Sequence, residues 1–542
     1  MDTPAPVAPE ARTRWFLAPG ERGNPATRLA GSHGDEVAWS IGNRVVPLVH
    51  GATYFRRLHE ELTALQAGDR VYFTDWRGDA DQCLLPGGPT VGEVMCGLAR
   101  AGVEVRALLW RSHSDHASFS AQQNDHLGAQ INEAGGEALL DQRVRRFGSH
   151  HQKLVVIRHR DDQARDVAFA GGIDLCHGRR DDAEHAGDPQ TQPMDKRYGQ
   201  RAPWHDVMLE LHGPVVADLL LSFTERWDDR HPLDRRTPYR RLVQHRADMP
   251  RHPEPLPETF PTPPAAGTQA VQVLRTYGRV HPRYPFAPQG ERSIARAYEK
   301  AFALARSFIY LEDQYLWSEP VARGIAVALR RSPQLRLIAV VPRYPDDDGH
   351  IDGPPNRLGQ ITALTLLREA APDRVSVFDL ENASGVPVYV HAKVCIVDDV
   401  WLTCGSDNFN RRSWTNDSEL TCAVIDDDSD DREPRRLDAH GDGARRLARD
   451  LRLQLWAEHL ARDPADPELL DPDSAVALWA ESAAALDGWH ASGGLGPRPP
   501  GQVRRHDPAP VNRLQRLWAA PMYNRVFDPD GRPRRLRRAG RF

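Results

Sequence analysis

Several common features are scarce in this sequence of 542 residues. Only four of its 70 basic residues are lysine, and the rest are arginine. Its six cysteines are scattered, with no CxxC pair and no metal-ligand spacing, so neither a disulfide framework nor a cysteine-bound metal is indicated. No window approaches the roughly 18 consecutive apolar residues that a membrane-spanning helix needs. The sequence pattern therefore predicts no transmembrane segment.

The chain also lacks a strong charge of either sign. A formal net charge of −5 and a pI of about 6.5 give no general attraction to nucleic acid, so any anion binding must be local. The first residues, Met1–Pro6, have neither the basic nor the apolar segment of a secretory signal. We therefore expect a cytoplasmic location, with peripheral attachment to a membrane as the alternative, and no nucleic-acid partner.

Two of the four lysines follow a histidine by two residues. The pairs are His151 with Lys153 and His391 with Lys393, and each runs into a continuous apolar segment. With 23 histidines in the chain, this is roughly a 1% coincidence. The pattern predicts a buried strand that places each histidine and its lysine on the same face. The alternative is a pair of surface histidines beside solvated lysines.

The surrounding sequence repeats the same alternation of helices and strands. Helices are expected over 54–65, 91–101, 293–306 and 356–369, and strands over 71–76, 103–110, 307–316, 335–341 and 375–380. This predicts an α/β fold of two duplicated halves, each with a mixed, mainly parallel sheet flanked by helices. The active site is expected at the pseudo-twofold interface between the halves.

Composition divides the chain into four parts. Residues 1–247 form the first half, and 248–267 are a linker with seven prolines. Residues 268–430 form the second half, and 431–542 are a helical extension that ends in a basic tail. The tail is expected to be solvated and mobile, with contact to anionic lipid as the alternative.

Paired histidines and lysines suit attack on an anionic phosphate. Neutral imidazole can form a covalent phosphoenzyme, and an imidazolium can protonate a departing alkoxide. Fixed cations and hydrogen-bond donors would stabilise the phosphoryl oxygens. This chemistry needs no metal and no cofactor. Because the halves are nearly symmetric, the residues alone leave open which histidine is the nucleophile.

The two HxK motifs, followed by Gly171-Gly172 and Gly405-Ser406-Asp407-Asn408, resemble the phospholipase D superfamily. Longer strings are similar to the eukaryote-like phospholipase D enzymes: His150–Lys153, Gly171–Cys176, Pro203–Asp206 and Ile309–Tyr315. The resemblance covers roughly residues 50–425. It implies the two-half phospholipase D fold and a phosphodiesterase activity.

The resemblance also implies roles for individual residues. His151 would be the nucleophile and His391 the acid, with Asp206 holding the first histidine and Glu419 holding its counterpart. The remaining implied residues are Lys153, Lys393 and Asn408 as catalytic groups, and Gly172, Asp174, Ser406 and Gln314 as substrate-binding groups.

The first motif departs from the family pattern at one position. Asp398 follows Lys393 by five residues, whereas Arg158 stands at the equivalent place after Lys153. We expect activity to survive this change, with Asp161 or Asp162 as a substitute for the missing acid.

The expected function is hydrolysis of a glycerophospholipid such as phosphatidylcholine at a membrane surface by a monomeric peripheral enzyme. It would yield phosphatidate and the headgroup alcohol through a phosphohistidine, and transphosphatidylation would be possible. One alternative is a cardiolipin-synthase-like phosphatidyltransferase or a nuclease on the same fold. An alternative of another class is an inactive protein that binds anionic lipid.

Overall fold

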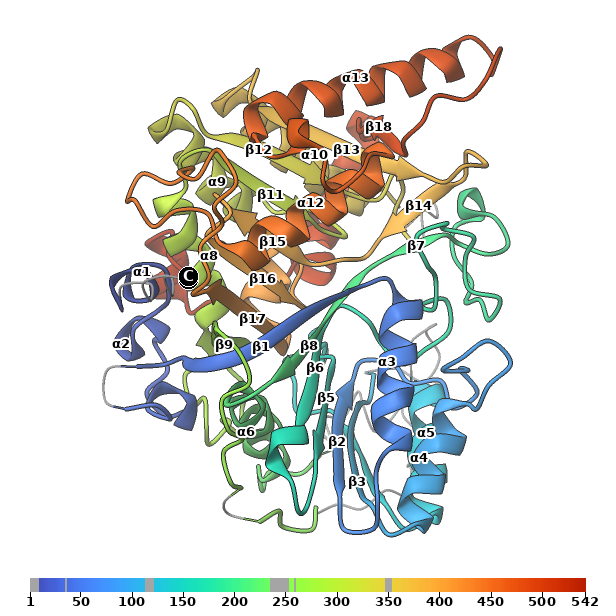
Figure 1. Cartoon of the computed structure of the whole chain (residues 1–542), viewed down its shortest axis with the longest axis vertical. Helices are drawn as coiled ribbons and strands as arrows, with labels where there is room; N and C mark the ends of the chain where they lie inside the picture. The colour runs from blue at the N-terminus through green and yellow to red at the C-terminus, as the bar shows by residue number, and fades with distance from the viewer. Residues whose placement is uncertain (1–8, 35–36, 113–120, 234–252, 258–259, 347–352) are drawn as a thin grey trace.

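The computed structural model describes residues 9–34, 37–112, 121–233, 253–257, 260–346 and 353–542. Two sheets, each flanked by helices, lie next to each other and meet along the long strand β1 (Ser40–Val49) (Figure 1). The predicted α/β class is confirmed. None of the described helices combines the length and apolar character that would let it cross a membrane.

The first sheet has a parallel part and an antiparallel part. Its strand order is β4-β3-β2-β5-β6-β8-β1. The first three strands run parallel to one another, and each later neighbour is antiparallel. The bounds are β2 (Arg70–Asp75), β3 (Glu104–Trp110), β4 (Glu137–Asp141), β5 (Leu154–Arg158), β6 (Val167–Gly171) and β8 (Val207–His212).

The second sheet repeats this order strand for strand as β13-β12-β11-β15-β16-β17-β9. Its parallel pairs are again the first two. Strand β9 pairs with β1, so the two sheets are continuous. The bounds are β9 (Gln269–Tyr277), β11 (Phe308–Glu312), β12 (Arg336–Val340), β13 (Val375–Glu381), β15 (Val394–Val397), β16 (Trp401–Gly405) and β17 (Glu419–Asp426).

Short strands join segments that are far apart in the sequence. Strand β14 (Pro387–Val390) pairs with β13 and, in parallel, with β7 (Trp204–His205), so it connects the two halves. Strand β10 (Glu291–Arg292) pairs with β9, and β18 (Val503–Arg505) pairs with β13.

The helices form where apolar side chains recur on one face. In α3 (Gly51–Thr63), Tyr54, Leu58 and Leu62 are buried one turn apart. The other helices are α1 (Pro9–Trp15), α2 (Pro19–Arg22), α4 (Val91–Arg100), α5 (Ala121–Glu133), α6 (Val215–Trp227), α8 (Ser293–Leu304), α9 (Glu319–Arg331), α10 (Gly353–Ala370), α11 (Arg411–Thr415), α12 (Arg446–Leu460), α13 (Pro472–Ala491), α14 (Arg513–Met522) and α15 (Arg534–Arg538).

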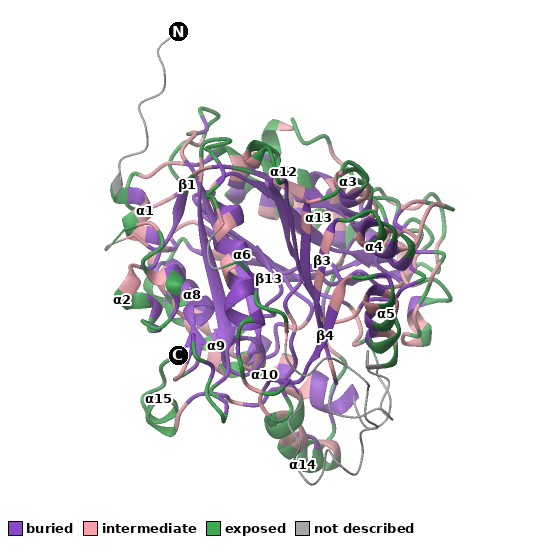
Figure 2. Cartoon of the chain, turned by 90° about the horizontal axis from the view of Figure 1, so that it is seen from below, coloured by how far each residue is buried: buried purple, intermediate pink, exposed green. Residues whose placement is uncertain are grey.

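The largest apolar cluster spans both halves and the C-terminal helices. It contains Leu209 of the first sheet, Val394 of the second, and Trp456 and Trp479 of α12 and α13. The buried strands run through the middle of the molecule, and the exposed residues lie on the surrounding helices and loops (Figure 2). The helical extension is therefore part of the core.

Two expectations about the connecting segments need comment. The proposed linker lies partly outside the described residues, and in its described part Leu256 is buried against the large cluster. The basic tail is not freely mobile at its end, because Phe542 is buried and its ring lies 5.3 Å from that of Trp414. The domain boundaries themselves stay a prediction.

Candidate active site

Both HxK motifs lie just before a strand rather than within one. His151 and Lys153 precede β5, and His391 and Lys393 occupy the break between β14 and β15. The prediction of one continuous strand through each motif was therefore wrong. In the break, His391 and Ala392 both donate their backbone N–H groups to the carbonyl of His205, so that carbonyl, and not a sheet neighbour, satisfies them.

Each motif pairs with a segment of the opposite half that carries an acidic residue. His150 bridges Ser418, and the backbone N–H of His151 donates to the Ser418 carbonyl at 2.9 Å. In the other half, Val390 pairs with His205. The next residue after each of these partners is a carboxylate, Glu419 or Asp206.

The carboxylates are exchanged between the halves. His151 Nδ1 lies 2.9 Å from Glu419 Oε2, and His391 Nδ1 lies 2.6 Å from Asp206 Oδ2. The expectation that Asp206 holds the first histidine and Glu419 the second was wrong. The acid that follows a motif in sequence serves the other motif, because the pseudo-twofold interface runs between them.

The occupied Nδ1 atoms determine what each imidazole can do. A carboxylate at Nδ1 fixes the N–H there and leaves Nε2 with its lone pair. Within the described residues, neither His151 Nε2 nor His391 Nε2 has a protein hydrogen-bond partner. The side chains are 14% and 6% exposed, respectively, so both rings are only just accessible.

The residues that follow Gly171 and Gly405 accommodate these carboxylates in two different ways. A Cβ atom on Gly172 would lie 2.1 Å from Asp206 Oδ1, so only glycine fits there. At the equivalent position, the Ser406 hydroxyl donates to Glu419 Oε2 at 2.6 Å. Gly172 and Ser406, predicted to bind substrate, thus contact the carboxylates that hold the histidines.

The two lysines are buried and directed by nearby oxygen atoms. Lys153 Nζ donates to the His151 carbonyl at 3.0 Å and forms an ion pair with Asp174 at 3.1 Å. Lys393 Nζ donates to the His391 carbonyl and to Gln314 Oε1, the latter at 3.3 Å. Burial lowers the pKa of Lys393 to about 8, and Asp206 opposes that shift.

Burial and the neighbouring cations favour the neutral form of both imidazoles. Burial lowers the pKa of His151 well below its ordinary value of 6.5, and Lys153 and Lys393 lower it further. Burial and Lys393 lower the pKa of His391 in the same way, with Arg179 adding to the effect. Each ring thus feels the charge of the lysine from its own half and from the other half. Burial also raises the pKa of Glu419 to about 8.

Arg179 and Trp204 are site residues that sequence reasoning missed. The Arg179 guanidinium lies 3.9 Å from the centroid of the Trp204 ring, and that ring lies 4.9 Å from the ring of His391. Arg179 and Lys153 lower the pKa of Asp174 despite its burial. Trp204 lies within the Pro203–Asp206 string and Arg179 follows the Gly171–Cys176 string by three residues, which was the available signal.

Asn408 and Gln314 complete the set of predicted residues. Asn408 is 3% exposed, and its Oδ1 accepts no hydrogen bond from the described residues. Gln314 Nε2 donates to the hydroxyl of Tyr389 at 2.7 Å. Gln314 also lines a cavity of about 390 Å³ together with Tyr315, while its Oε1 accepts a hydrogen bond from Lys393.

Five residues after its lysine, the first motif has Arg158 where the second motif has Asp398, and an acid from a later position pairs with this arginine. Arg158 forms a buried salt bridge of 2.6 Å with Asp166, which also accepts the backbone N–H of His159. In the second half, Asp398 accepts backbone N–H groups at the start of β11. The suggestion that Asp161 or Asp162 substitutes was wrong, since Asp161 is exposed and Asp162 only caps a short turn.

A family model described as Phospholipase D matches residues 64–319 and 365–492, which is more than half of the chain. Among curated proteins, Phospholipase D A from Dictyostelium discoideum is 28% identical over 375 residues, covering 59% of this chain and 27% of that protein. Phospholipase D alpha 1 from Arabidopsis thaliana is 26% identical over 560 residues, covering 79% of this chain and 66% of that protein. The chain thus spans less than two thirds of the length of these relatives.

Among solved structures, a phosphatidylserine synthase from Haemophilus influenzae aligns with a TM-score of 0.46 and 14% identity. The alignment covers 71% of this chain and 82% of that one.

Proposed function

Because the chain belongs to the phospholipase D family, we propose that it is a phosphodiesterase that hydrolyses a glycerophospholipid to phosphatidate and the headgroup alcohol. The observation that carries this proposal is the exchanged pair of histidine–carboxylate hydrogen bonds, one contributed from each half to the other. Two imidazoles with free Nε2 atoms, flanked by two buried lysines, supply what displacement at phosphorus requires.

The first step forms a covalent phosphoenzyme. Nε2 of His151 attacks phosphorus with its lone pair, and the P–O bond to the headgroup alcohol breaks. His391 takes up a proton at Nε2 before this step, because the negative charge of the bound phosphate and Asp206 at Nδ1 both favour the imidazolium, and it gives that proton to the departing oxygen. The family resemblance supports this assignment of nucleophile and acid.

The second step releases the product. His391, now neutral, takes a proton from water, and the hydroxide oxygen attacks phosphorus while the P–Nε2 bond breaks. Phosphatidate leaves, and His151 returns to its neutral form with Glu419 at Nδ1. An alcohol in place of water gives a phosphatidyl alcohol by the same step, which is transphosphatidylation.

The lysines stabilise the charge that develops on the phosphoryl oxygens. Lys153 and Lys393 bring fixed positive charge to a dry site, where it acts more strongly than in water. Asn408, whose side chain has an unpaired carbonyl oxygen, supplies an amide N–H donor in the same region. The cavity beside Gln314 offers space for the part of the substrate beyond the phosphate.

Helix α14 offers a surface for contact with a bilayer. Leu514, Leu517 and Trp518 are 76%, 75% and 37% exposed on this helix. Arg513 and Arg516 are exposed beside them. An exposed apolar face rimmed by arginines suits insertion at the headgroup level of a phospholipid membrane. This supports peripheral attachment of the enzyme to its substrate surface.

The test is a headgroup-release assay on vesicles of phosphatidylcholine and phosphatidylglycerol with added ethanol. The wild-type protein should release choline and form phosphatidylethanol, whereas His151→Ala should do neither. Phosphatidylethanol would establish both the reaction class and the covalent route. Activity on plasmid DNA without activity on lipid would support a nuclease instead, and no turnover of either substrate would leave an inactive lipid-binding protein.

A further inference from the structure

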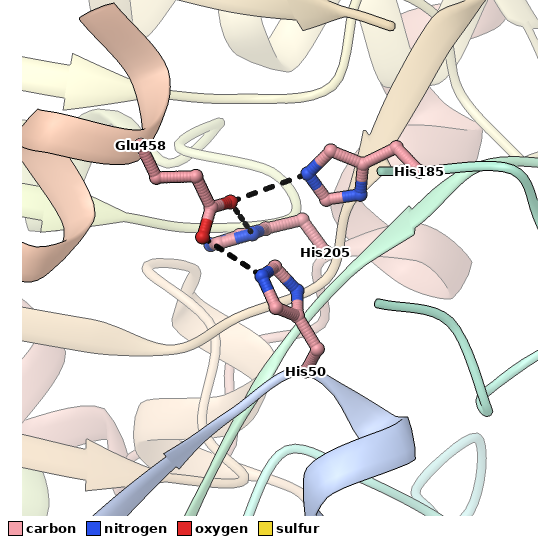
Figure 3. A group of neighbouring side chains, drawn as sticks. All are labelled: His50, His185, His205 and Glu458. Carbon is pink, nitrogen blue, oxygen red and sulfur yellow. Dashed lines mark hydrogen bonds and ion pairs between the residues drawn. The ribbon is translucent and has the colours of Figure 1, made fainter. Parts of the chain in front are cut away.

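A second group of buried histidines lies apart from the two catalytic imidazoles. His50, His185 and His205 converge on the carboxylate of Glu458 (Figure 3). Their ring centroids are 5.1 to 5.7 Å apart. His185 and His205 are completely buried, and His50 is 5% exposed. The four candidate ligand atoms all lie within 4.8 Å of one another.

The hydrogen bonds around the cluster turn free nitrogen atoms toward its centre. His205 Nε2 lies 2.8 Å from Glu312, and His185 Nδ1 lies 3.2 Å from the Trp204 carbonyl. With each outer partner accepting an N–H, His205 Nδ1 and His185 Nε2 carry lone pairs on the inner side when the rings are neutral. This is the arrangement of outer carboxylates and carbonyls that orients metal-bound histidines.

The inner nitrogen atoms are left without a proper partner. Among the described residues, neither His185 Nε2 nor His205 Nδ1 makes a hydrogen bond, and Glu458 Oε1 accepts none. His185 Nε2 and His205 Nδ1 lie 3.3 and 3.8 Å from that oxygen. Buried polar atoms normally have partners, so three such atoms facing one another point to a ligand that is shared among them.

The spacing fits a tetrahedral metal ion. Metal–ligand distances of about 2.0–2.1 Å in a tetrahedron place neighbouring ligand atoms about 3.3 Å apart. The observed contacts with Glu458 run from 2.8 to 3.8 Å, so small side-chain shifts would complete the site. Three imidazole nitrogens and one carboxylate oxygen are typical ligands of zinc.

Two of the three histidines also hold an unfavourable backbone conformation. His50 has φ of 70° and His185 has φ of 51°, in a region that residues other than glycine rarely adopt. Strain of this kind persists where the surroundings require a particular side-chain position, and it concentrates at ligand sites. Both His50 and His185, whose backbones carry this strain, place their side chains in the same cluster.

We propose that His50, His185, His205 and Glu458 form a structural site for a tetrahedrally coordinated divalent transition metal ion, with zinc as the best match. The ligands come from the start of α3, the loop before β7, strand β7 itself and helix α12. The site is separate from the phosphate chemistry, since no ligand is one of the catalytic residues.

The proposed ion would hold β7 in place. His205 precedes Asp206, whose carboxylate lies against His391, and the His205 carbonyl receives the backbone N–H of His391. The backbone N–H of His50 donates to the Asp206 carbonyl at 2.9 Å. A metal ion at the cluster would therefore connect helix α12 and the loop that carries His185 to strand β7, which positions His391.

Metal content of the tag-free, full-length protein tests the proposal without reference to activity. The protein is treated with a chelator, incubated with excess ZnSO₄, desalted and measured by inductively coupled plasma mass spectrometry. We expect about one zinc ion per chain, and cobalt in its place should give the intense visible bands of a tetrahedral site. A wild-type chain that retains no zinc and shows no such bands overturns the proposal.

Matched variants locate the ion. His185→Ala and Glu458→Gln should each lose most of the bound zinc, whereas His391→Ala and His212→Gln should retain it. Zinc lost from His391→Ala but kept by His185→Ala would place the ion at the catalytic histidines and refute the assignment. Removal of zinc from the wild type should also lower Tm, because a ligand bound only to the folded state stabilises it. This Tm shift should vanish in Glu458→Gln.

Discussion

At the scale of single residues, the carboxylates that hold the two HxK histidines have different surroundings. Glu419 shares one oxygen between His151 and Ser406, while Asp206 fits against Gly172. Glu419 thus receives a hydrogen bond from the Ser406 hydroxyl, whereas Asp206 lies against a glycine that has no side chain. This difference makes the two histidine environments unequal although the strand pattern around them repeats.

The two acids near the start of β17 should differ sharply in their effect on turnover. Glu419→Gln replaces the carboxyl partner of His151 Nδ1 by an amide and should reduce kcat by roughly 100-fold or more, as loss of a proton-transfer partner does. Asp417→Asn should cost far less, because Asp417 contacts Arg412 and the Ser149 backbone instead. Steady-state kinetics on lipid vesicles measures both, and equal losses would remove Glu419 from its proposed role.

The pH profile should reflect the shifted titrations. Since burial and the two lysines lower the pKa of His151, the nucleophile stays neutral as pH falls through 6.5, and the acid limb of kcat/KM should lie below that value. On the alkaline side, Lys393 loses its charge as pH rises through its pKa of about 8, so activity should decline there. Lys393→Arg should move the alkaline limb upward, since arginine stays charged. An unmoved limb would assign it to another group.

Gly172 should tolerate no side chain. Gly172→Ala places a methyl group on Asp206 and should displace that carboxylate from His391, with a loss of roughly 100-fold in kcat, since misplacement by about 1 Å can cost that much. Gly97→Ala in α4 is the control, because a methyl group there meets nothing within 4 Å. Circular dichroism should confirm that both variants are folded.

At the scale of secondary-structure elements, the repeated alternation of helices and strands could be predicted from the sequence and the pairing between the halves could not. Apolar runs and amphipathic helices are local signals, and they placed β2, β3, β11 and β12 correctly. The parallel contact of β14 with β7 joins residues 185 positions apart, which no local pattern records. That contact exchanges the carboxylates, so the candidate residues could be predicted while their partnership could not.

The ion pair that follows β5 should support folding rather than catalysis. Asp166→Asn leaves the buried guanidinium of Arg158 without its partner and should cost about 3–5 kcal/mol of stability. Asp161→Asn, at an exposed position, should change stability by less than about 0.5 kcal/mol. Urea unfolding followed by intrinsic fluorescence distinguishes them. A kcat for Asp166→Asn that falls in parallel with stability would contradict a purely structural role.

At the scale of the whole molecule, the extension after the second half belongs to the catalytic unit. Helix α12 contributes tryptophan to the shared core and Glu458 to the histidine cluster, and β18 extends the second sheet at β13. The buried carboxylate of Asp399, after β15, receives hydrogen bonds from Arg449 and Arg452 of α12. The basic tail also docks through its last residue, which its composition did not indicate.

Membrane contact through α14 should be separable from the chemistry. The double variant Leu517→Ser with Trp518→Ser should bind vesicles less tightly and raise the apparent KM on vesicles several-fold. Its activity on a dispersed short-chain phospholipid should be unchanged, because α14 contributes no catalytic group. Leu495→Ser, at another highly exposed leucine, is the control and should bind as the wild type does. Vesicle sedimentation and parallel kinetics measure both properties.

Each half supplies the carboxylate that holds the histidine of the other half, so the site cannot be complete before both halves have been synthesised. A nascent chain that has emerged only as far as β8 already holds His151 and Lys153, yet Glu419 has still to be made. The same fragment contains Asp206 but not His391, the histidine that this carboxylate holds. Such an intermediate has no competent proton partner and should cleave nothing, so the proposed lipid-degrading activity should begin only when the last strands of the second sheet are in place.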